Sequence, residues 1–190
     1  MVRHISKQQK TMAGDEYITE QCNADINKGF PLLMKAYQQK VYWHIRRLVV
    51  SHEDAEDLLQ DVFVKIYSRW DTFRGDSSLA TWIYRIATNE CLTFLNRQKI
   101  RMANEGGDAN DMSNLLASSE YTEYGDKLVT ALQEAVLKLP EMQRLVFNMR
   151  YYDNMSYQDI AQVTGSSTSA AKTNYHIAKG KVTEYVKQIF

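Results

Sequence analysis

Apolar residues recur every three or four positions through most of the N-terminal half of the chain. This spacing puts them on one side of a helix, and it predicts helices over residues 30–50, 51–70 and 79–97. The second helix begins at Ser51, a suitable N-cap. The carboxylates in its first turns lie at the positive end of the helix dipole, where negative charge stabilises a helix. Residues 1–25 are polar without a clear period, and we expect them to be frayed.

The C-terminal third has a second helical pattern. Two helices are predicted over residues 127–152. Ser156 then caps a short helix, Gly165 breaks it, and a longer helix starts at Thr168 or Ser169. A capped short helix, a glycine turn and a longer second helix are typical of a helix-turn-helix that reads a DNA major groove.

Residues 102–126 separate these two halves. They contain six acidic residues, a pair of glycines and no lysine or arginine. A segment with so little to bury is typical of a linker. The predicted fold class is all-α, with two small helical domains, residues 26–101 and 127–190, joined by this acidic flexible linker. We expect the second to be a winged-helix-like four-helix domain that contains the helix-turn-helix.

Composition argues against several classes of protein. No apolar run approaches the ~20 residues of a membrane span, and the N-terminus lacks the apolar core of a signal peptide. We therefore expect a cytoplasmic protein without membrane insertion. Cys22 and Cys91 are far apart in the sequence and belong to no Cys/His group, which argues against a zinc site or a disulfide. Without a candidate nucleophile, metal cluster or phosphate loop, we expect no catalysis and no cofactor.

The zero net charge hides local differences. Residues 127–190 carry eight Lys and Arg against five Asp and Glu, a difference of three, and residues 71–101 carry five against three. Two mildly basic segments thus flank the acidic one. Local charge is what a phosphate backbone senses, so this division favours a nucleic-acid partner.

The helix that starts at Thr168 has two distinct faces. Its apolar face consists of Ala171, Tyr175, Ala178, Val182 and Val186. The opposite face is hydroxylic at its start and basic further on. With the preceding serine it supplies the candidate DNA contacts: Ser167, Thr168, Ser169, Lys172, Thr173, His176 and Lys179. Such a face suits a recognition helix, and the alternative is the solvated outer face of a small bundle.

The helix over residues 79–97 is also two-faced. Ile83, Ala87, Cys91 and Phe94 share one side, while Arg85, Asn89, Thr93 and Asn96 share the other, with Arg97 at its edge. Arginine, asparagine and threonine contact phosphates and base edges, and nearby aromatics such as Trp82 can stack on unpaired bases. The alternative is again a solvated face over a packed core.

Carboxylates crowd the start of the helix over residues 51–70. The spacing of a calcium loop is missing, and no histidine supports a hydrolytic metal. A helix start that compensates the dipole is one explanation, and a docking surface for a basic partner is the other. The candidate docking residues are Asp54, Asp57, Leu58, Gln60, Asp61 and Lys65.

Four ordered motifs resemble the sigma-70 family of transcription initiation factors. Residues 54–67 (DAEDLLQDVFVKIY) are similar to its region 2.2, and residues 73–92 (FRGDSSLATWIYRIATNECL) to regions 2.3 and 2.4 of its extracytoplasmic-function branch. Residues 139–147 (LPEMQRLVF) and 155–161 (MSYQDIA) resemble region 4. No region 1.1 or region 3 fits into residues 102–126, as is typical of this branch.

The resemblance implies a role for each segment. Core RNA polymerase would be bound through the clamp helices of its largest subunit, by residues 54–67, and through its flap. The loop over residues 74–78 would take up a flipped base of the −10 element, and the helix after it would hold the opened strand. Residues 168–183 would enter the −35 major groove, and residues 102–126 would follow the RNA path. The implied −10 contacts are Arg74, Ser77, Ser78, Trp82, Arg85, Asn89, Thr93 and Arg97.

The function implied is that of an alternative sigma factor, with promoter DNA, core polymerase and an anti-sigma factor as partners. The alternative is a stand-alone helix-turn-helix regulator that binds closed duplex as a dimer. One departure from the family pattern concerns the recognition helix. Asn174 and Ile177 stand where arginines are usual, which implies weaker phosphate contacts at −35.

Overall fold

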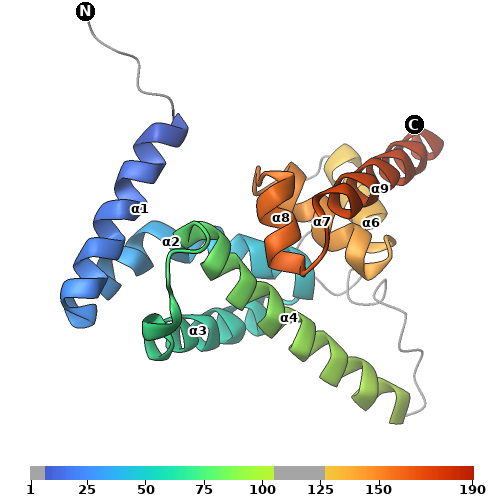
Figure 1. Ribbon diagram of the computed structural model, residues 1–190. Helices are drawn as coiled ribbons and strands as arrows, with labels where there is room; N and C mark the ends of the chain where they lie inside the picture. The colour runs from blue at the N-terminus through green and yellow to red at the C-terminus, as the bar shows by residue number, and fades with distance from the viewer. Residues whose placement is uncertain (1–6, 105–126) are drawn as a thin grey trace, which may run out of the picture.

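The computed structural model describes residues 7–104 and 127–190, with side chains from Gly14 onward (Figure 1). Within these ranges the structure is helical and contains no strand, which confirms the all-α prediction. The elements are α1 (Lys7–Ala24), α2 (Ile26–Val49), α3 (His52–Ser68), the short 3-10 helix η1 (Trp70–Thr72), α4 (Leu79–Asn104), α6 (Lys127–Leu137), α7 (Glu141–Tyr151), α8 (Tyr157–Thr164) and α9 (Thr168–Ile189). Most of the predicted linker, residues 105–126, lies outside the described ranges.

Helices α2, α3 and α4 form the centre of the N-terminal domain. Asp25 caps α2 by accepting a hydrogen bond from the Asn27 amide (3.0 Å), and Ser51 caps α3 by accepting one from the Asp54 amide (3.3 Å). The apolar stripes predicted from the sequence meet in a core in which Ile45 and Ile83 are fully buried. Capping and periodicity therefore account for these three helices.

Helix α1 corrects the expectation of a frayed N-terminus for residues 7–24, which are helical. It packs along α2, and its Ile18 and Cys22 are buried. The Tyr37 hydroxyl donates a hydrogen bond to Asp15 Oδ1 (2.6 Å), and burial raises the pKa of that carboxyl despite the hydrogen bond and nearby Lys40. With two buried apolar side chains, α1 has too weak a period to be recognised in the sequence, and tertiary packing supplies what propensity lacks.

Gly29 allows the close crossing of α1 and α2. A Cβ atom at this position would lie 2.3 Å from the backbone nitrogen of Cys22. No side chain tolerates that separation, so the two helices approach each other at a backbone-to-backbone distance that only glycine permits.

Helices α6 to α9 form the C-terminal domain, which is the predicted four-helix unit. A small apolar cluster lies at its centre: Ala135, Val136, Leu139, Phe147, Ala178 and Val182. Helix α9 crosses both α6 and α7 and is the long element of the domain in Figure 1.

Helix α4 is longer than the pattern predicted. It continues past Arg97 to Asn104, so residues 102–104, assigned to the linker, are helical. Residues 97–102 (RQKIRM) favour helix intrinsically, and the Lys99 ammonium donates to Glu141 Oε2 of α7 (2.8 Å). The helix therefore extends beyond the part that its buried face stabilises.

The two domains pack against each other. Helix α8 lies on α4, and α7 contacts α2. Buried apolar residues of the C-terminal domain, including Leu145, Met149 and Ile160, belong to the same core cluster as those of the N-terminal domain. The sequence predicted two domains but not this contact between them.

Candidate nucleic-acid and polymerase surfaces

Helices α8 and α9 form the predicted helix-turn-helix, and local capping sets where each begins. Ser156 Oγ accepts from the Asp159 amide (3.1 Å) and donates to that residue's carboxylate (2.5 Å). Gly165 ends α8 in the left-handed region at φ 66. Ser167 then accepts from the Ala170 amide (3.1 Å) and caps α9. The Ser156 cap and the Gly165 turn predicted from the sequence are thus confirmed, and Ser167 is a further cap that was not predicted.

Helix α9 buries one face and exposes the other. Ala171, Ala178 and Val182 are buried, while Tyr175 is half-buried. The seven predicted −35 contacts are all exposed: Ser167, Thr168, Ser169, Lys172, Thr173, His176 and Lys179. The structure therefore brings these residues together on one continuous, accessible helix face.

Two arginines that contribute to the local positive charge support the fold instead. The Arg150 guanidinium lies over the Tyr157 ring at 4.9 Å and donates to the Met155 carbonyl (2.8 Å). The Tyr157 ring in turn meets Tyr175 of α9 edge-on at 6.0 Å, which fixes the crossing of α8 and α9. Arg144 is buried, and this burial lowers its pKa. The basic surface of the domain is accordingly smaller than its composition indicated.

An aromatic cluster supports the loop that precedes α4. Trp82 meets Phe73 at 5.2 Å and Trp70 at 5.9 Å between ring centroids, and the Trp70 indole donates to Asn23 of α1 (3.0 Å). Trp82 is only 9% exposed. The sequence predicted that its side chain contacts DNA, but in this structure it lies behind the loop and is not available to a partner.

The loop itself presents part of its predicted set. Arg74 is exposed and Ser77 is half-buried. Ser78 is exposed, but its hydroxyl accepts a hydrogen bond from the Thr81 amide (3.1 Å) and so caps α4. Of these residues, Arg74 has the freest side chain for a nucleic acid.

The predicted stripe on α4 changes in exposure along the helix. Arg85 is half-buried, and its Nε has no hydrogen-bond partner among the described residues. Asn89, Thr93 and Arg97 are exposed. The Thr93 hydroxyl donates to the backbone carbonyl of Asn89 (2.8 Å), while the Asn89 side chain is exposed. The open part of the stripe therefore begins at Asn89.

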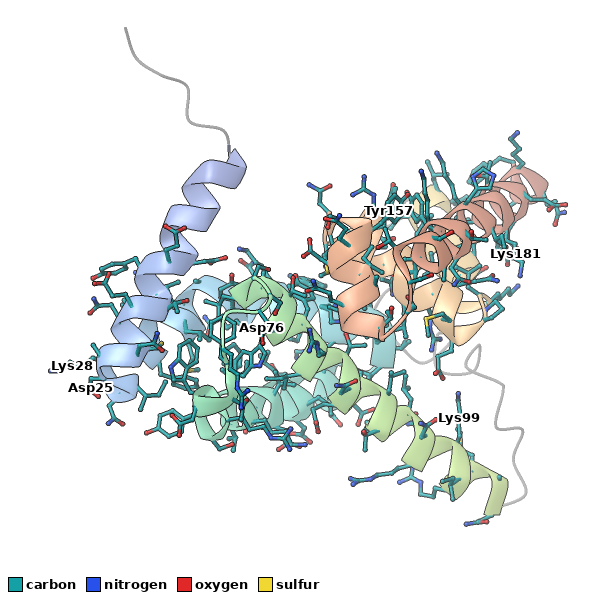
Figure 2. The ribbon with its side chains drawn as sticks, viewed as in Figure 1. Asp25, Lys28, Asp76, Lys99, Tyr157 and Lys181 are labelled. Atoms are coloured by element: carbon teal, nitrogen blue, oxygen red, sulfur yellow. The ribbon has the colours of Figure 1, made fainter. Side chains whose placement is uncertain are left out.

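A groove of about 840 Å³ lies beside the loop, and sequence reasoning did not anticipate its walls. One wall is the loop over residues 73–79, another is α1, and Asp159 and Gln162 of α8 form the rest. Its titratable lining is acidic: Asp15, Glu16, Glu20, Asp76 and Asp159. Figure 2 shows Asp76 on the loop that leads into α4. A phosphate strand entering this groove would meet several carboxylates.

Helix α3 carries the predicted polymerase contacts. Asp57, Gln60 and Asp61 are exposed, and Asp54 is half-buried. Leu58 corrects the prediction, because it is 6% exposed and belongs to the core.

Two other residues of α3 refine this surface. Lys65 pairs with Glu90 of α4, so its charge is neutralised locally. Val64 was missed, although its side chain is 66% exposed and follows Asp57 and Asp61 at helical spacing. The signal was present in the sequence, because Val64 is an apolar residue off the buried stripe.

The chemistry of the described residues offers no other site. Residues 14–104 and 127–190 contain no group of three metal-ligating side chains. Both cysteines are buried, and burial raises the pKa of each thiol, so neither is a reactive thiolate. No helix in the described ranges is long and apolar enough to cross a membrane.

Comparison with known families matches both halves of the chain. Residues 33–100 match Sigma-70 region 2, and residues 130–182 match Sigma-70, region 4. The chain is 28% identical over 183 residues to the ECF RNA polymerase sigma-E factor of Escherichia coli strain K12, covering 92% of this chain and 95% of that protein. It is 30% identical over 161 residues to the RNA polymerase sigma-H factor of Pseudomonas aeruginosa, covering 80% and 83%.

Two solved structures share the fold. The sigma factor RpoE from Bartonella quintana, in complex with the anti-sigma factor NepR, superposes with a TM-score of 0.72 at 22% identity and covers 84% of this chain and 98% of that one. CnrH in complex with the cytosolic domain of CnrY gives a TM-score of 0.68 at 20% identity, covering 92% and 98%.

Proposed function

The chain belongs to the extracytoplasmic-function branch of the sigma-70 family, and we propose on that basis how its surfaces share the work of promoter recognition. It is an alternative sigma factor that binds core RNA polymerase and directs transcription initiation. The observation that carries the proposal is that a capped helix-turn-helix with a wholly exposed polar face and an exposed Asn/Thr/Arg stripe occur in one chain.

Helix α9 would read the −35 element. Its first turn presents hydroxyls at the positive end of the helix dipole, which suits base edges and the nearest phosphate. Lys172 and Lys179 follow one and three turns later and would contact the DNA backbone.

The loop and the exposed part of α4 would hold the −10 strand. Extracting a base from the stack costs a few kcal/mol, and binding of the unpaired strand offsets this cost. Arg74 would contact phosphate, while Asn89 and Thr93 would contact the opened strand. On this proposal promoter opening requires neither ATP nor an active site in this chain, which acts as a non-enzymatic initiation subunit in the cytoplasm.

The exposed face of α3 would bind the clamp helices of the polymerase. Asp57 and Asp61 precede the exposed Val64 on this face, so the complementary surface is basic with an apolar contact at one end. Such charge complementarity orients two partners and speeds their encounter, while the apolar contact adds affinity. The C-terminal domain would contact the flap.

An anti-sigma factor is the remaining proposed partner. The two structural neighbours were each solved with another protein bound, NepR in one case and the cytosolic domain of CnrY in the other. The similarity of fold supports the same kind of sequestration here. Residues 105–126, outside the described ranges, would follow the RNA path of the polymerase.

Reconstituted transcription tests the proposed function. Purified chain added to core polymerase should give transcripts from promoters mapped by the start sites that appear on its overexpression. Val64→Glu should reduce core binding, while Glu53→Gln, at the start of the same helix, should not. Binding to a palindromic closed duplex without any association with core polymerase would instead identify a stand-alone regulator.

A further inference from the structure

Asn23, near the end of α1, binds the buried indole of Trp70. Its side-chain oxygen accepts a hydrogen bond from Trp70 Nε1 at 3.0 Å, and the Trp70 side chain is 6% exposed. A buried N–H group that loses its acceptor destabilises the structure, so this bond favours one orientation of the indole. Helix α1 lies outside the segment that matches Sigma-70 region 2, which starts at residue 33. The family match therefore does not account for this contact.

The corner between α1 and α2 fixes the place of Asn23. The backbone of its neighbour Cys22 passes so close to Gly29 that a Cβ atom there would lie 2.3 Å away. The Asp25 amide donates to the Gln21 carbonyl (3.0 Å), and the Asp25 side chain caps α2. Figure 2 labels Asp25 at this corner. Because the backbone on both sides of Asn23 is held, its side chain is a fixed acceptor for the indole.

The Trp70 ring belongs to the aromatic cluster that precedes α4. Its centroid lies 5.5 Å from that of Phe73 and 5.9 Å from that of Trp82, and the Phe73 and Trp82 centroids lie 5.2 Å apart. Each ring thus contacts the other two. Since aromatic pairs prefer particular relative orientations, a rotation of the Trp70 ring would displace Phe73. Phe73 directly precedes the loop over residues 74–78, so the cluster sets where that loop begins.

The loop over residues 74–78 has few contacts of its own. No hydrogen bond or ion pair joins residues 74–77 to another residue in the described ranges. Gly75 has φ 80, and nothing lies within 4 Å of a Cβ atom built on it. The loop is therefore held at its two ends, by Phe73 in the aromatic cluster and by Ser78, which caps α4. Its conformation depends on whether these two ends stay in place.

We propose that Asn23 is a positioning residue for the −10 loop and acts through the Trp70 indole and the Phe73 ring. The inference rests on the proposed function of the loop and α4. A protein whose binding-competent state is only fractionally populated binds with an apparent affinity reduced by that fraction. Loss of the Asn23 acceptor should lower the fraction of molecules in which the loop has its binding geometry. Binding of the unpaired strand should weaken, while binding of core polymerase and of a −35 duplex should not.

Two substitutions separate positioning from a direct contact with the strand, because Asn23 also lines the groove beside the loop. Asn23→Leu has a similar shape and removes the acceptor. Asn23→Asp keeps an acceptor for the indole N–H but repels phosphate. Positioning predicts weaker strand binding in Asn23→Leu and nearly normal binding in Asn23→Asp. A direct contact predicts weaker binding in both, and that result would overturn the proposal.

Hydrogen exchange of the Trp70 indole proton measures the contact without DNA. The chain has three tryptophans, and the Trp70 indole signal in the magnetic resonance spectrum is the one that disappears in Trp70→Phe. Exchange should become severalfold faster in Asn23→Leu and stay close to the wild-type rate in Asn23→Asp. An unchanged exchange rate in Asn23→Leu would show that this hydrogen bond does not hold the indole, and it would overturn the proposal.

Strand binding by the reconstituted holoenzyme gives the functional readout. The probe is a fluorescent single-stranded oligonucleotide that carries the −10 sequence of a mapped promoter. Asn23→Leu should weaken its binding roughly fivefold, and Asn23→Asp should retain most of the affinity. Unchanged strand binding in Asn23→Leu would overturn the positioning role.

Asn27→Leu is the matched control at the same corner. The Asn27 side-chain oxygen accepts from the Tyr67 hydroxyl at 2.8 Å, so this substitution also removes a hydrogen bond to the end of α3. Tyr67 packs on Phe30 at 5.1 Å and does not belong to the cluster before the loop. Asn27→Leu should therefore leave strand binding unchanged. An equal loss in Asn23→Leu and Asn27→Leu would reduce Asn23 to general support of the corner.

Trp70→Phe completes a double-mutant cycle. It keeps an aromatic ring and removes the donor, so it should weaken strand binding by itself, and Asn23→Leu should then add little. Full additivity would overturn the action through the indole. If Asn23→Leu unfolds by circular dichroism, Asn23→Asp with normal binding and Trp70→Phe with weakened binding support the proposal, and any other pair of results contradicts it. Absence of core-dependent transcription by the wild-type chain would contradict the proposed function instead, whatever the exchange rates show.

Discussion

The proposed −35 and −10 surfaces were predicted by the same reasoning, yet their residues differ in exposure in the structure. On α9 every predicted contact is exposed. On α4 the exposure begins only at Asn89, because Trp82 lies in an aromatic cluster and Arg85 is partly covered. Periodicity identifies the face that a helix turns toward its own core. It does not reveal whether another domain packs on the remaining side, as α8 does near Thr81 of α4.

Gly29→Ala should have the largest effect, and it should impair the proposed −10 surface while sparing the −35 surface. The added Cβ would lie 2.3 Å from the Cys22 backbone, so α1 must shift and release Asn23 from Trp70. We expect a loss of about 2–3 kcal/mol in the free energy of unfolding, measured by urea denaturation. Strand binding at the loop should weaken while binding of a −35 duplex by the folded protein is retained.

Gly14→Ala is the matched control, since nothing lies within 4 Å of the added atom. It should be neutral or slightly stabilising, because alanine favours helix. Equal destabilisation by both substitutions would show that helix α1 does not support the loop through its close crossing.

Asn89→Ala tests the open part of the α4 stripe. We expect roughly tenfold slower promoter opening, about 1.4 kcal/mol, with little change in the affinity of the closed complex. Permanganate footprinting of the polymerase complex measures opening. Asn104→Ala, at the exposed end of the same helix, should leave opening unchanged. A change in thermal stability alone would remove Asn89 from the nucleic-acid surface.

Ser156→Ala tests the framework of the helix-turn-helix. Loss of this cap should cost about 1 kcal/mol of stability and loosen α8. The same substitution at Ser51, which caps α3, should cost a similar amount in thermal denaturation. Only Ser156→Ala should also weaken binding of a −35 duplex. If both or neither weakened it, the link between the cap and the recognition helix would be refuted.

Lys172→Ala should produce the smallest effect. Loss of one phosphate contact should weaken −35 duplex binding severalfold. It should also reduce the slope of log affinity against log salt concentration by about one. Fluorescence anisotropy across a salt series measures both. Lys181 is the control on the same helix, because its ammonium donates to Gln143 (3.0 Å) within the domain. An equal loss in Lys181→Ala would indicate nonspecific charge attraction instead of a defined contact.

Local rules predicted much of this fold correctly. Ser51, Ser156 and Gly165 each set a helix end where the sequence placed it, because capping and a left-handed turn depend on neighbouring residues alone. Helix α1 was missed because its stability comes from packing on α2 and not from its own pattern. Leu58 and Trp82 were misplaced for a related reason. Both fall near the edge of a helix stripe, where the neighbouring helix or loop decides burial.

The sequence by itself determined the all-α class, the helix-turn-helix and the polar face of α9, because these follow from periodicity and short-range hydrogen bonds. Only the tertiary structure decided that Asp153 pairs with His44 and Arg47 across 109 and 106 residues. It also decided that Asp159 and Gln162 of α8 line the groove beside the loop over residues 73–79. Such contacts depend on where two folded surfaces meet, and no local spacing encodes which carboxylate will lie opposite which cation.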